Sequence, residues 1–108
     1  MNKGEVWIVE FPSVDVHEQI GTRPVIILAD TKTSICTVIP LTSNLNSLRF
    51  PYTTEIKKSE LNKLDSDSIA LIFHVRAIDK RRLIKKIGFL EKDYINQIDN
   101  IIRDYLKL

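Results

Sequence analysis

The stretch HEQIGTRPVIIL, residues 17–28, changes character halfway along. Its first half is polar and typical of a loop, whereas its second half is rich in β-branched residues and typical of a buried strand. Arg23 lies at the boundary between the two halves. A cation at the last loop residue before a rigid strand is held by packing on one side and faces solvent on the other, which is a suitable arrangement for binding a ligand. An arginine that flanks a strand is more often only solvated surface, so position alone does not assign Arg23 a function.

The composition of the chain predicts one small globular domain. Its 108 residues, 44% of them hydrophobic, suffice for a modest core, and we expect a single domain over residues 1–108. The net charge of +2 does not by itself indicate a nucleic-acid-binding protein. The N-terminus has no secretory pattern and no apolar run approaches ~20 residues, so we expect a cytoplasmic protein.

Short apolar segments separated by turn residues predict a mainly β (α+β) fold. We expect strands at residues 5–11, 23–29, 35–41, 52–56, 69–75 and 85–90. Because proline has no backbone donor, we expect pairing of the third strand to stop at Pro40. The segment 69–75 is apolar almost throughout, which predicts a central place in the sheet.

The segments between these strands read as turns, and the C-terminal segment reads as a helix. We expect a long loop at residues 12–22, a second loop at 42–47, one helical turn within 57–64 and a short helical or 3₁₀ turn at 79–83. From Lys92 onwards, apolar residues recur at spacings of three and four, which predicts an amphipathic helix. Together these elements predict a small, strongly bent β-barrel closed by a C-terminal α-helix.

The sequence gives little support for a metal site or for a catalytic cysteine. The two histidines and the one cysteine stand at positions 17, 74 and 36, and these spacings fit no metal-ligand motif. Cys36 lies in an apolar run, which suits a small buried residue better than a nucleophile. The three glycines are isolated, so there is no glycine-rich phosphate loop either. We therefore expect no metal and no cofactor.

A metal-free group of polar residues remains. If the strands at 23–29 and 35–41 form a hairpin, Arg23 and the hydroxyl pair Thr42 and Ser43 lie at its open end. A guanidinium beside a hydroxyl suits a reaction that builds negative charge on a phosphoryl group, such as attack of an RNA 2′-OH on the adjacent phosphorus. Arg23 would stabilise that charge and Thr42 would hold the phosphate or the attacking hydroxyl.

The general base is open at this point. His17 has a suitable intrinsic pKa and lies in the loop before Arg23, and Glu18 is the second candidate. A basic run adds to the picture, because residues 76–86 hold six basic side chains and one acid, Asp79. This run could form a basic face, although such runs are often only solvated surface.

Five short motifs, in this order, resemble the MazF/PemK family of toxin ribonucleases. They are GEVW (4–7), HEQIGTRPV (17–25), IPLTS (39–43), DS (67–68) and RAIDK followed by RL (76–83). The resemblance implies a small SH3-like/CcdB-like β-barrel, a homodimer, and sequence-specific, metal-independent cleavage of single-stranded RNA. It also implies a small antitoxin that lays a disordered segment over the dimer groove.

By position, the resemblance assigns roles to individual residues. Its arginine and threonine fall on Arg23 and Thr42. The implied substrate-loop residues are His17, Glu18 and Gln19, and we take Ser43, His74 and Arg76 as further candidate substrate contacts. The family motif that usually reads Gln, one residue, Arg-Thr-Ile-Asp is here HVRAID (74–79), so His74 either replaces a polar RNA contact or is a satisfied histidine in the core or in a dimer contact.

The chain also departs from the family at two positions. Members of the PemK-like branch use an arginine and an aspartate where this chain has Leu71 and Phe73, so that acid/base pair is missing. The Arg23 and Thr42 part of the mechanism is kept. Two hypotheses of different class follow: a toxin endoribonuclease, or a CcdB-like protein on the same fold that binds RNA or inhibits a partner without cutting RNA.

Overall fold

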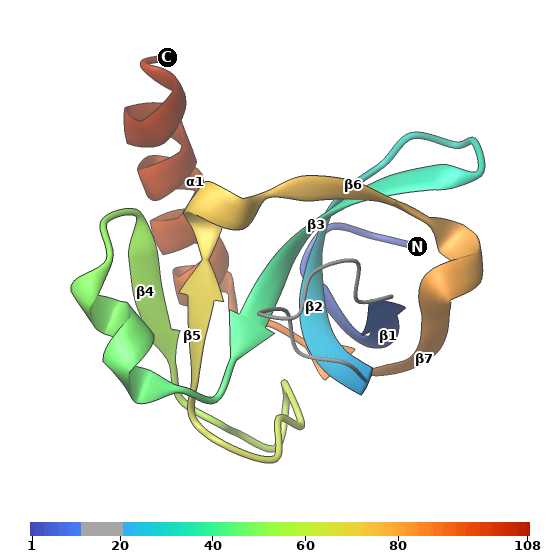
Figure 1. Cartoon of the computed structure of the whole chain (residues 1–108), viewed down its shortest axis with the longest axis horizontal. Helices are drawn as coiled ribbons and strands as arrows, with labels where there is room; N and C mark the ends of the chain where they lie inside the picture. Colours follow the sequence, from blue (N-terminus) through green and yellow to red (C-terminus); the bar gives the residue numbers. More distant parts are fainter. Residues whose placement is uncertain (12–20) are drawn as a thin grey trace.

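The β-branched run that follows Arg23 forms the strand around which the sheet is built (Figure 1). The structure is a computed structural model and describes residues 1–11 and 21–108. Its strands are β1 (Glu5–Phe11), β2 (Gly21–Asp30), β3 (Ile35–Thr42), β4 (Thr53–Ile56), β5 (Ser68–Leu71), β6 (Arg76–Asp79) and β7 (Leu83–Phe89). Between and after them lie three 3₁₀ helices, η1 (Leu45–Arg49), η2 (Ile72–His74) and η3 (Lys80–Arg82), and the helix α1 (Lys92–Leu106).

β2 and β3 form the predicted antiparallel hairpin. The pairing runs from Asp30 opposite Cys36 to Val25 opposite Pro40. The turn between the strands places Lys32 at a φ of 63°, and the Asp30 carboxylate accepts a hydrogen bond of 2.8 Å from the Lys32 N–H. A polar turn after a β-branched run therefore specifies the hairpin locally.

The predicted mainly β fold with a C-terminal helix is confirmed, but the sheet does not close into a ring. The strand order is β4-β5-β3-β2-β1-β7, and β6 pairs with β3 beside this path. β4 and β7 are the two ends of the path, with the chain from β6 through η3 arching between β3 and β7 (Figure 1). The sheet is strongly bent, as expected, but open.

The strand predicted at residues 69–75 is wrong as one element. The chain forms β5, turns through η2 and continues as β6. Both strands pair with the same edge of β3, since β5 lies opposite Leu41 and Thr42 while β6 lies opposite the segment 35–38. The β5 part of the run is buried, but its predicted central place is wrong, because β5 is next to the last strand at that end of the sheet. The break at η2 arises because β5 and β6 share one edge of β3.

The expectation that pairing ends at Pro40 is also wrong. β3 continues to Thr42 and pairs there with Ile69. Pro40 falls between the last residue paired with β6, Val38, and the first paired with β5, Leu41. On that edge a missing N–H is tolerated because no strand partner stands opposite it.

Other predicted turns agree with the structure in part. The segment 57–64 contains a single turn, in which the Lys63 N–H donates to the Ser59 carbonyl at 2.9 Å. The predicted 3₁₀ turn after Asp79 is confirmed as η3. The loop predicted at 42–47 is wrong beyond Asn44, since η1 begins at Leu45, where the Asn44 side chain accepts from the Asn46 N–H.

Two clusters of buried residues lie on the two faces of the bent sheet. The helix-side core contains Val6, Ile26, Ile39, Leu41, Ile56, Leu64, Ala70, Ile72, Leu90 and Ile98. The opposite-face core contains Val9, Phe11, Val25, Ile27, Cys36, Val38 and Ile78. α1 covers the first of these through Ile98, as its periodic apolar residues predict. No helix in the described ranges is long and apolar enough to cross a membrane.

Candidate functional site

The open end of the β2–β3 hairpin brings Arg23 and Thr42 opposite each other. The register places Val25 opposite Pro40, and Arg23 and Thr42 each lie two residues further along their strands. Val9 stands opposite Arg23 on one side, and Ile69 stands opposite Thr42 on the other. Because opposed residues of an antiparallel pair point to the same face, Arg23 and Thr42 share one face of the sheet.

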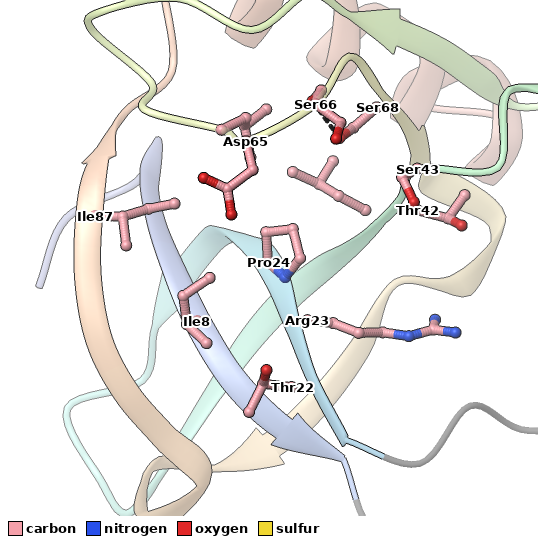
Figure 2. A pocket seen from close by; sticks show the side chains of 12 residues that line it. Ile8, Thr22, Arg23, Pro24, Thr42, Ser43, Asp65, Ser66, Ser68 and Ile87 are labelled. Atoms are coloured by element: carbon pink, nitrogen blue, oxygen red, sulfur yellow. Dashed lines mark hydrogen bonds between the residues drawn. The ribbon is translucent and has the colours of Figure 1, made fainter.

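That face is the one that carries the opposite-face core. Val25 and Ile27 belong to this core and alternate with Pro24 and Ile26, which point to the helix side. Figure 2 shows the side chains of Arg23 and Thr42 extending to the same side, away from Ile8 and Ile87. The guanidinium and the hydroxyl therefore lie at the edge of the apolar interior, where a ligand can reach them.

A pocket of about 250 Å³ lies at this end of the hairpin (Figure 2). Its apolar wall is made by Ile8, Pro24, Leu41, Leu64 and Ile87. Its polar lining is made by Thr22, Arg23, Thr42, Ser43, Asp65, Ser66 and Ser68. Figure 2 shows Asp65 on the wall away from Arg23. An anionic group would therefore be favoured at the Arg23 and Thr42 side and repelled at the Asp65 side.

The polar groups at this end have few partners in the part of the chain that the structure describes. Arg23 is half-buried, and no ion pair or hydrogen bond joins its guanidinium to any other residue in 1–11 or 21–108. The Thr42 hydroxyl accepts a hydrogen bond of 3.2 Å from the Asn44 N–H and keeps its own proton to donate. Ser43, also predicted, lines the pocket and is exposed.

The other predicted residues fall in three places. His17, Glu18 and Gln19 lie outside the residues that the structure describes. Arg76 opens β6 and its guanidinium stacks over the Phe11 ring, 4.8 Å from the centroid, at the Arg23 side of the sheet. His74 is exposed on η2 and does not line the pocket.

Sequence reasoning missed part of the pocket lining. Asp65 and Ser66 were given no role from the sequence, and they come to the site because the chain from the 57–64 turn returns to β5 beside Thr42. Ser68 is buried and its hydroxyl donates to the Ser66 carbonyl at 3.0 Å. The polar composition of residues 65–68 was the available signal, but it does not show that this segment lines the same pocket as Arg23.

The basic run at residues 76–86 is partly neutralised by acids of the same chain. Lys80 contacts Asp30 at 2.6 Å, Arg81 contacts Asp79 at 3.0 Å, and Lys86 lies 3.6 Å from Glu5. The remaining cations of the run, which form no ion pair within the described residues, are Arg76, Arg82 and Lys85. About half of the positive charges of the run are therefore engaged in ion pairs within the chain.

These pairs shift the pKa values of the acids involved. The hydrogen bond from Lys80 and the Lys32 N–H lower the pKa of Asp30 to about 2. Hydrogen bonds from the Arg81 guanidinium and backbone lower the pKa of Asp79. Burial raises the pKa of Cys36, which lies in the opposite-face core and has no access to solvent, so its thiol remains protonated and unreactive.

The GEVW segment (4–7) contains a buried carboxylate, that of Glu5, and its neighbours in the segment help to satisfy it. Glu5 accepts a hydrogen bond of 2.8 Å from the Trp7 indole and one of 3.0 Å from the Asn2 N–H. Burial alone would raise the pKa of Glu5, but these hydrogen bonds and the Lys86 charge outweigh it and lower the pKa. The carboxylate thus fixes the start of β1, which is a structural role.

Comparison with known proteins places the fold and the family. The profile of the PemK-like, MazF-like toxins of type II toxin–antitoxin systems matches residues 2–106. Endoribonuclease MazF of Staphylococcus epidermidis is 32% identical over 106 residues, which cover 94% of this chain and 88% of that protein.

Solved structures agree with this placement at the level of the fold. The MazE–MazF structure (Form-II) from Deinococcus radiodurans has a TM-score of 0.77 at 20% identity, covering 100% of this chain and 96% of that one. An endoribonuclease in complex with its cognate antitoxin from Mycobacterial species has a TM-score of 0.73 at 16% identity, covering 98% and 94%. With the family profile spanning nearly the whole sequence, this chain belongs to the PemK-like, MazF-like toxins of type II toxin–antitoxin systems.

Proposed function

We propose that this chain is a toxin endoribonuclease that cleaves single-stranded RNA without a metal ion. The observation that carries the proposal is the pairing of Arg23 and Thr42 at the open end of one hairpin, on one face and beside a pocket. The name of the relative from Staphylococcus epidermidis supports the enzyme class.

In the proposed reaction, the 2′-OH of one nucleotide attacks the adjacent phosphorus. The P–O5′ bond breaks, which leaves a 2′,3′-cyclic phosphate on one product and a 5′-OH on the other. Negative charge grows on the non-bridging oxygens during attack, and the Arg23 guanidinium, with its fixed fork of donors, would stabilise it. The Thr42 hydroxyl would donate to one of these oxygens and so orient the phosphate.

The proton of the attacking 2′-OH needs a base, and the 5′-oxygen needs a proton donor. Arg23 suits neither role, because its pKa lies above about 12 and it stays protonated. We keep His17 as the proposed base, with Glu18 as the alternative, since both precede Arg23 closely in the sequence. Solvent water would supply the proton to the departing 5′-oxygen. Gln19, Ser43, His74 and Arg76 remain proposed substrate contacts.

The proposed partners follow from the family and from charge. The solved relatives include a MazE–MazF structure and an endoribonuclease bound to its cognate antitoxin. We propose that an acidic antitoxin segment binds the cations that have no acidic partner in the described chain, Arg76, Arg82 and Lys85, and blocks RNA entry at Arg23. We also propose that the active form is a homodimer in the cytoplasm.

The test is cleavage of a mixed single-stranded RNA by the purified protein in EDTA, with analysis of the product ends. We expect cyclic-phosphate ends, and we expect them to disappear for Arg23→Ala. The matched control is Arg103→Ala, because Arg103 is an exposed arginine on α1, away from the pocket. RNA binding without cleavage by the folded wild type would instead support a binding protein, and it would make Leu71 and Phe73 signs of a lost active site.

A further inference from the structure

Four side chains form a continuous row on the surface beside η1 and η2. The guanidinium carbon of Arg49 lies 4.9 Å from the centroid of the Phe50 ring. The rings of Phe50 and Phe73 meet edge to face with 6.0 Å between centroids. The Phe73 ring in turn lies 4.7 Å from the His74 ring. The row therefore runs from Arg49 through two phenylalanines to His74, with a basic side chain at each end.

This row is exposed to solvent. Phe50 is 44% exposed, and Arg49 and His74 are exposed as well, while Phe73 is half-buried. None of the four residues belongs to either core. Exposed aromatic surface bordered by polar groups is typical of a binding site.

The two segments that carry the row are fastened to each other. The Ile72 N–H donates to the Tyr52 carbonyl at 3.1 Å, and Tyr52 adopts a φ of 58°, which is unusual for a bulky residue. Its ring packs against Tyr105, 4.8 Å between centroids, and the Tyr105 hydroxyl donates to the Phe73 carbonyl at 3.4 Å. The rings are therefore held in position before any ligand arrives.

The row begins beside η1, which packs on β4 and β5, and β5 is the strand that pairs with Thr42. Ile69 stands opposite Thr42, and Leu71 lies two residues further along β5, so both point to that face. Their neighbour Ala70 points to the helix-side core instead. Ile69 and Leu71 are buried where η1 packs on β4 and β5, and Phe50 follows η1 directly.

The distance between the row and the hairpin end suits one RNA strand that contacts both. Phe73 is four residues beyond Ile69, which corresponds to about 13 Å or less along an extended chain. On this face Glu55 stands opposite Ile69, and its carboxylate lies 3.8 Å from the Lys57 ammonium. The surroundings are therefore compatible with an anionic strand.

We propose that this row is a stacking platform for one unpaired base of the RNA that Arg23 and Thr42 act on. The inference rests on the proposed function and names a substrate contact within it. A flat ring is a good partner for any base, and stacking of this kind is typical of proteins that bind single strands. Arg49 adds a cation that can stack on the base or bind the next phosphate.

The experiment uses a single-stranded RNA in which every 2′-hydroxyl is methylated, so that it binds but cannot be cut. Phe50→Leu and Phe73→Leu keep apolar volume and remove the flat ring. We expect each to weaken binding about 5- to 100-fold in fluorescence anisotropy. The matched control is Phe89→Leu, because Phe89 is also an exposed phenylalanine with a cation over its ring, Lys86 at 4.3 Å.

A scan of abasic positions along the same RNA identifies the stacked base. We expect one abasic position to weaken binding to the wild type, and the same change to have no effect on binding to Phe73→Leu. Equal affinities of Phe73→Leu and Phe89→Leu for RNA would overturn the inference. A change in self-association or in binding of an acidic peptide, with RNA affinity unchanged, would also overturn it and indicate a protein contact.

The outcome separates this inference from the proposed function. If the wild type cleaves RNA and Phe73→Leu binds it normally, the platform is wrong and the enzyme remains. If the wild type binds RNA through Phe73 and Phe50 but does not cleave the unmethylated strand in EDTA, the platform remains and the endoribonuclease proposal is wrong.

Discussion

The two ends of the β2–β3 hairpin both carry charged and hydroxyl side chains, but they use them differently. At the turn end, the Asp30 carboxylate contacts the Lys80 ammonium at 2.6 Å and the N-terminal ammonium at 3.6 Å. The hydroxyls of Thr31 and Thr33 hydrogen-bond to each other at 2.6 Å. At the open end, the Arg23 guanidinium has no partner among the described residues, and Thr42 accepts only from the Asn44 N–H.

The difference distinguishes a charge that stabilises the fold, at Asp30, from a charge that is available to a ligand, at Arg23. The Asp30 carboxylate is paired and hydrogen-bonded within the chain, and these interactions lower its pKa. The backbone of Arg23 is held in β2, and its guanidinium donors have no acceptor within residues 1–11 and 21–108. We therefore expect changes at the open end to alter activity, and changes at the turn end to alter stability.

The largest effect is expected for Arg23→Ala. Removing the donors that stabilise the developing phosphorane charge should lower kcat for RNA cleavage about 100- to 1000-fold, or about 3 to 4 kcal/mol. The thermal midpoint should change little, because the guanidinium makes no ion pair with a described residue. Cleavage assays and a thermal melt of the same preparation measure both. A fall in stability with full specific activity would reverse the roles assigned to the two ends.

The next effect is expected for Thr42→Val. Valine keeps the shape of threonine and its preference for a strand but removes the hydroxyl. Loss of one hydrogen bond to a charged phosphate should lower kcat/KM about 10- to 100-fold. Thr42→Ser should restore most of it in the same steady-state assay. Thr42→Val with the activity of the wild type would show that the hydroxyl is not needed, and failure of serine to rescue would show that the methyl group is needed as well.

Gly88→Ala tests whether loss of stability alone mimics loss of function. A Cβ at Gly88 would lie 2.5 Å from the Leu61 carbonyl oxygen and 2.7 Å from that of Asn62, and these are backbone atoms. We expect the free energy of unfolding to fall by about 1–3 kcal/mol. Below the melting transition, cleavage should stay within about twofold of the wild type. Denaturant unfolding measures the free energy of unfolding. A Gly88→Ala protein as stable as the wild type would show that β7 can shift away from the Leu61 and Asn62 backbone at little cost.

The smallest effect is expected for Asp30→Asn at the turn end. The folded-state pKa of Asp30 is lowered to about 2, so the carboxylate stabilises the fold above its ordinary pKa and loses this contribution as pH falls toward 2. Asp30→Asn should melt at a lower temperature than the wild type at pH 7, and the difference should shrink between about pH 4 and 2. RNA cleavage at pH 7 should be unchanged. Thermal melts across this pH range measure the difference in melting temperature. A difference that does not change with pH would mean that the Asp30 charge does not stabilise the fold.

Much of the fold could be predicted from local pattern. β1 has the predicted bounds, Glu5–Phe11, and α1 begins at Lys92 as its periodicity indicates. The hairpin turn and η3 also follow from their polar residues. The errors lie where a residue's partner is far away in the sequence. An apolar run such as 69–75 cannot show that β3 pairs with two different strands along one edge.

The candidate site was predictable to the extent that one hairpin contains it. Arg23 and Thr42 belong to neighbouring strands joined by a short turn, so counting from the turn places them opposite each other. Asp65 and Ser66 reach the same pocket through a separate turn, and no local pattern announces this. The same holds for Phe50 and Phe73, which are more than twenty positions apart in the sequence and meet because Tyr52 and Ile72 are hydrogen-bonded.

By itself, the sequence determined the family, the order of most strands, the terminal helix and the Arg23 and Thr42 pair, because periodicity, turn residues and short motifs are local properties. Only the tertiary structure decided that the sheet stays open, that half of the basic run is neutralised within the chain, and that Arg49, Phe50, Phe73 and His74 form one row. The physical reason is that strand partners, ion pairs and ring contacts depend on distances between segments, which the order of residues along the chain does not contain.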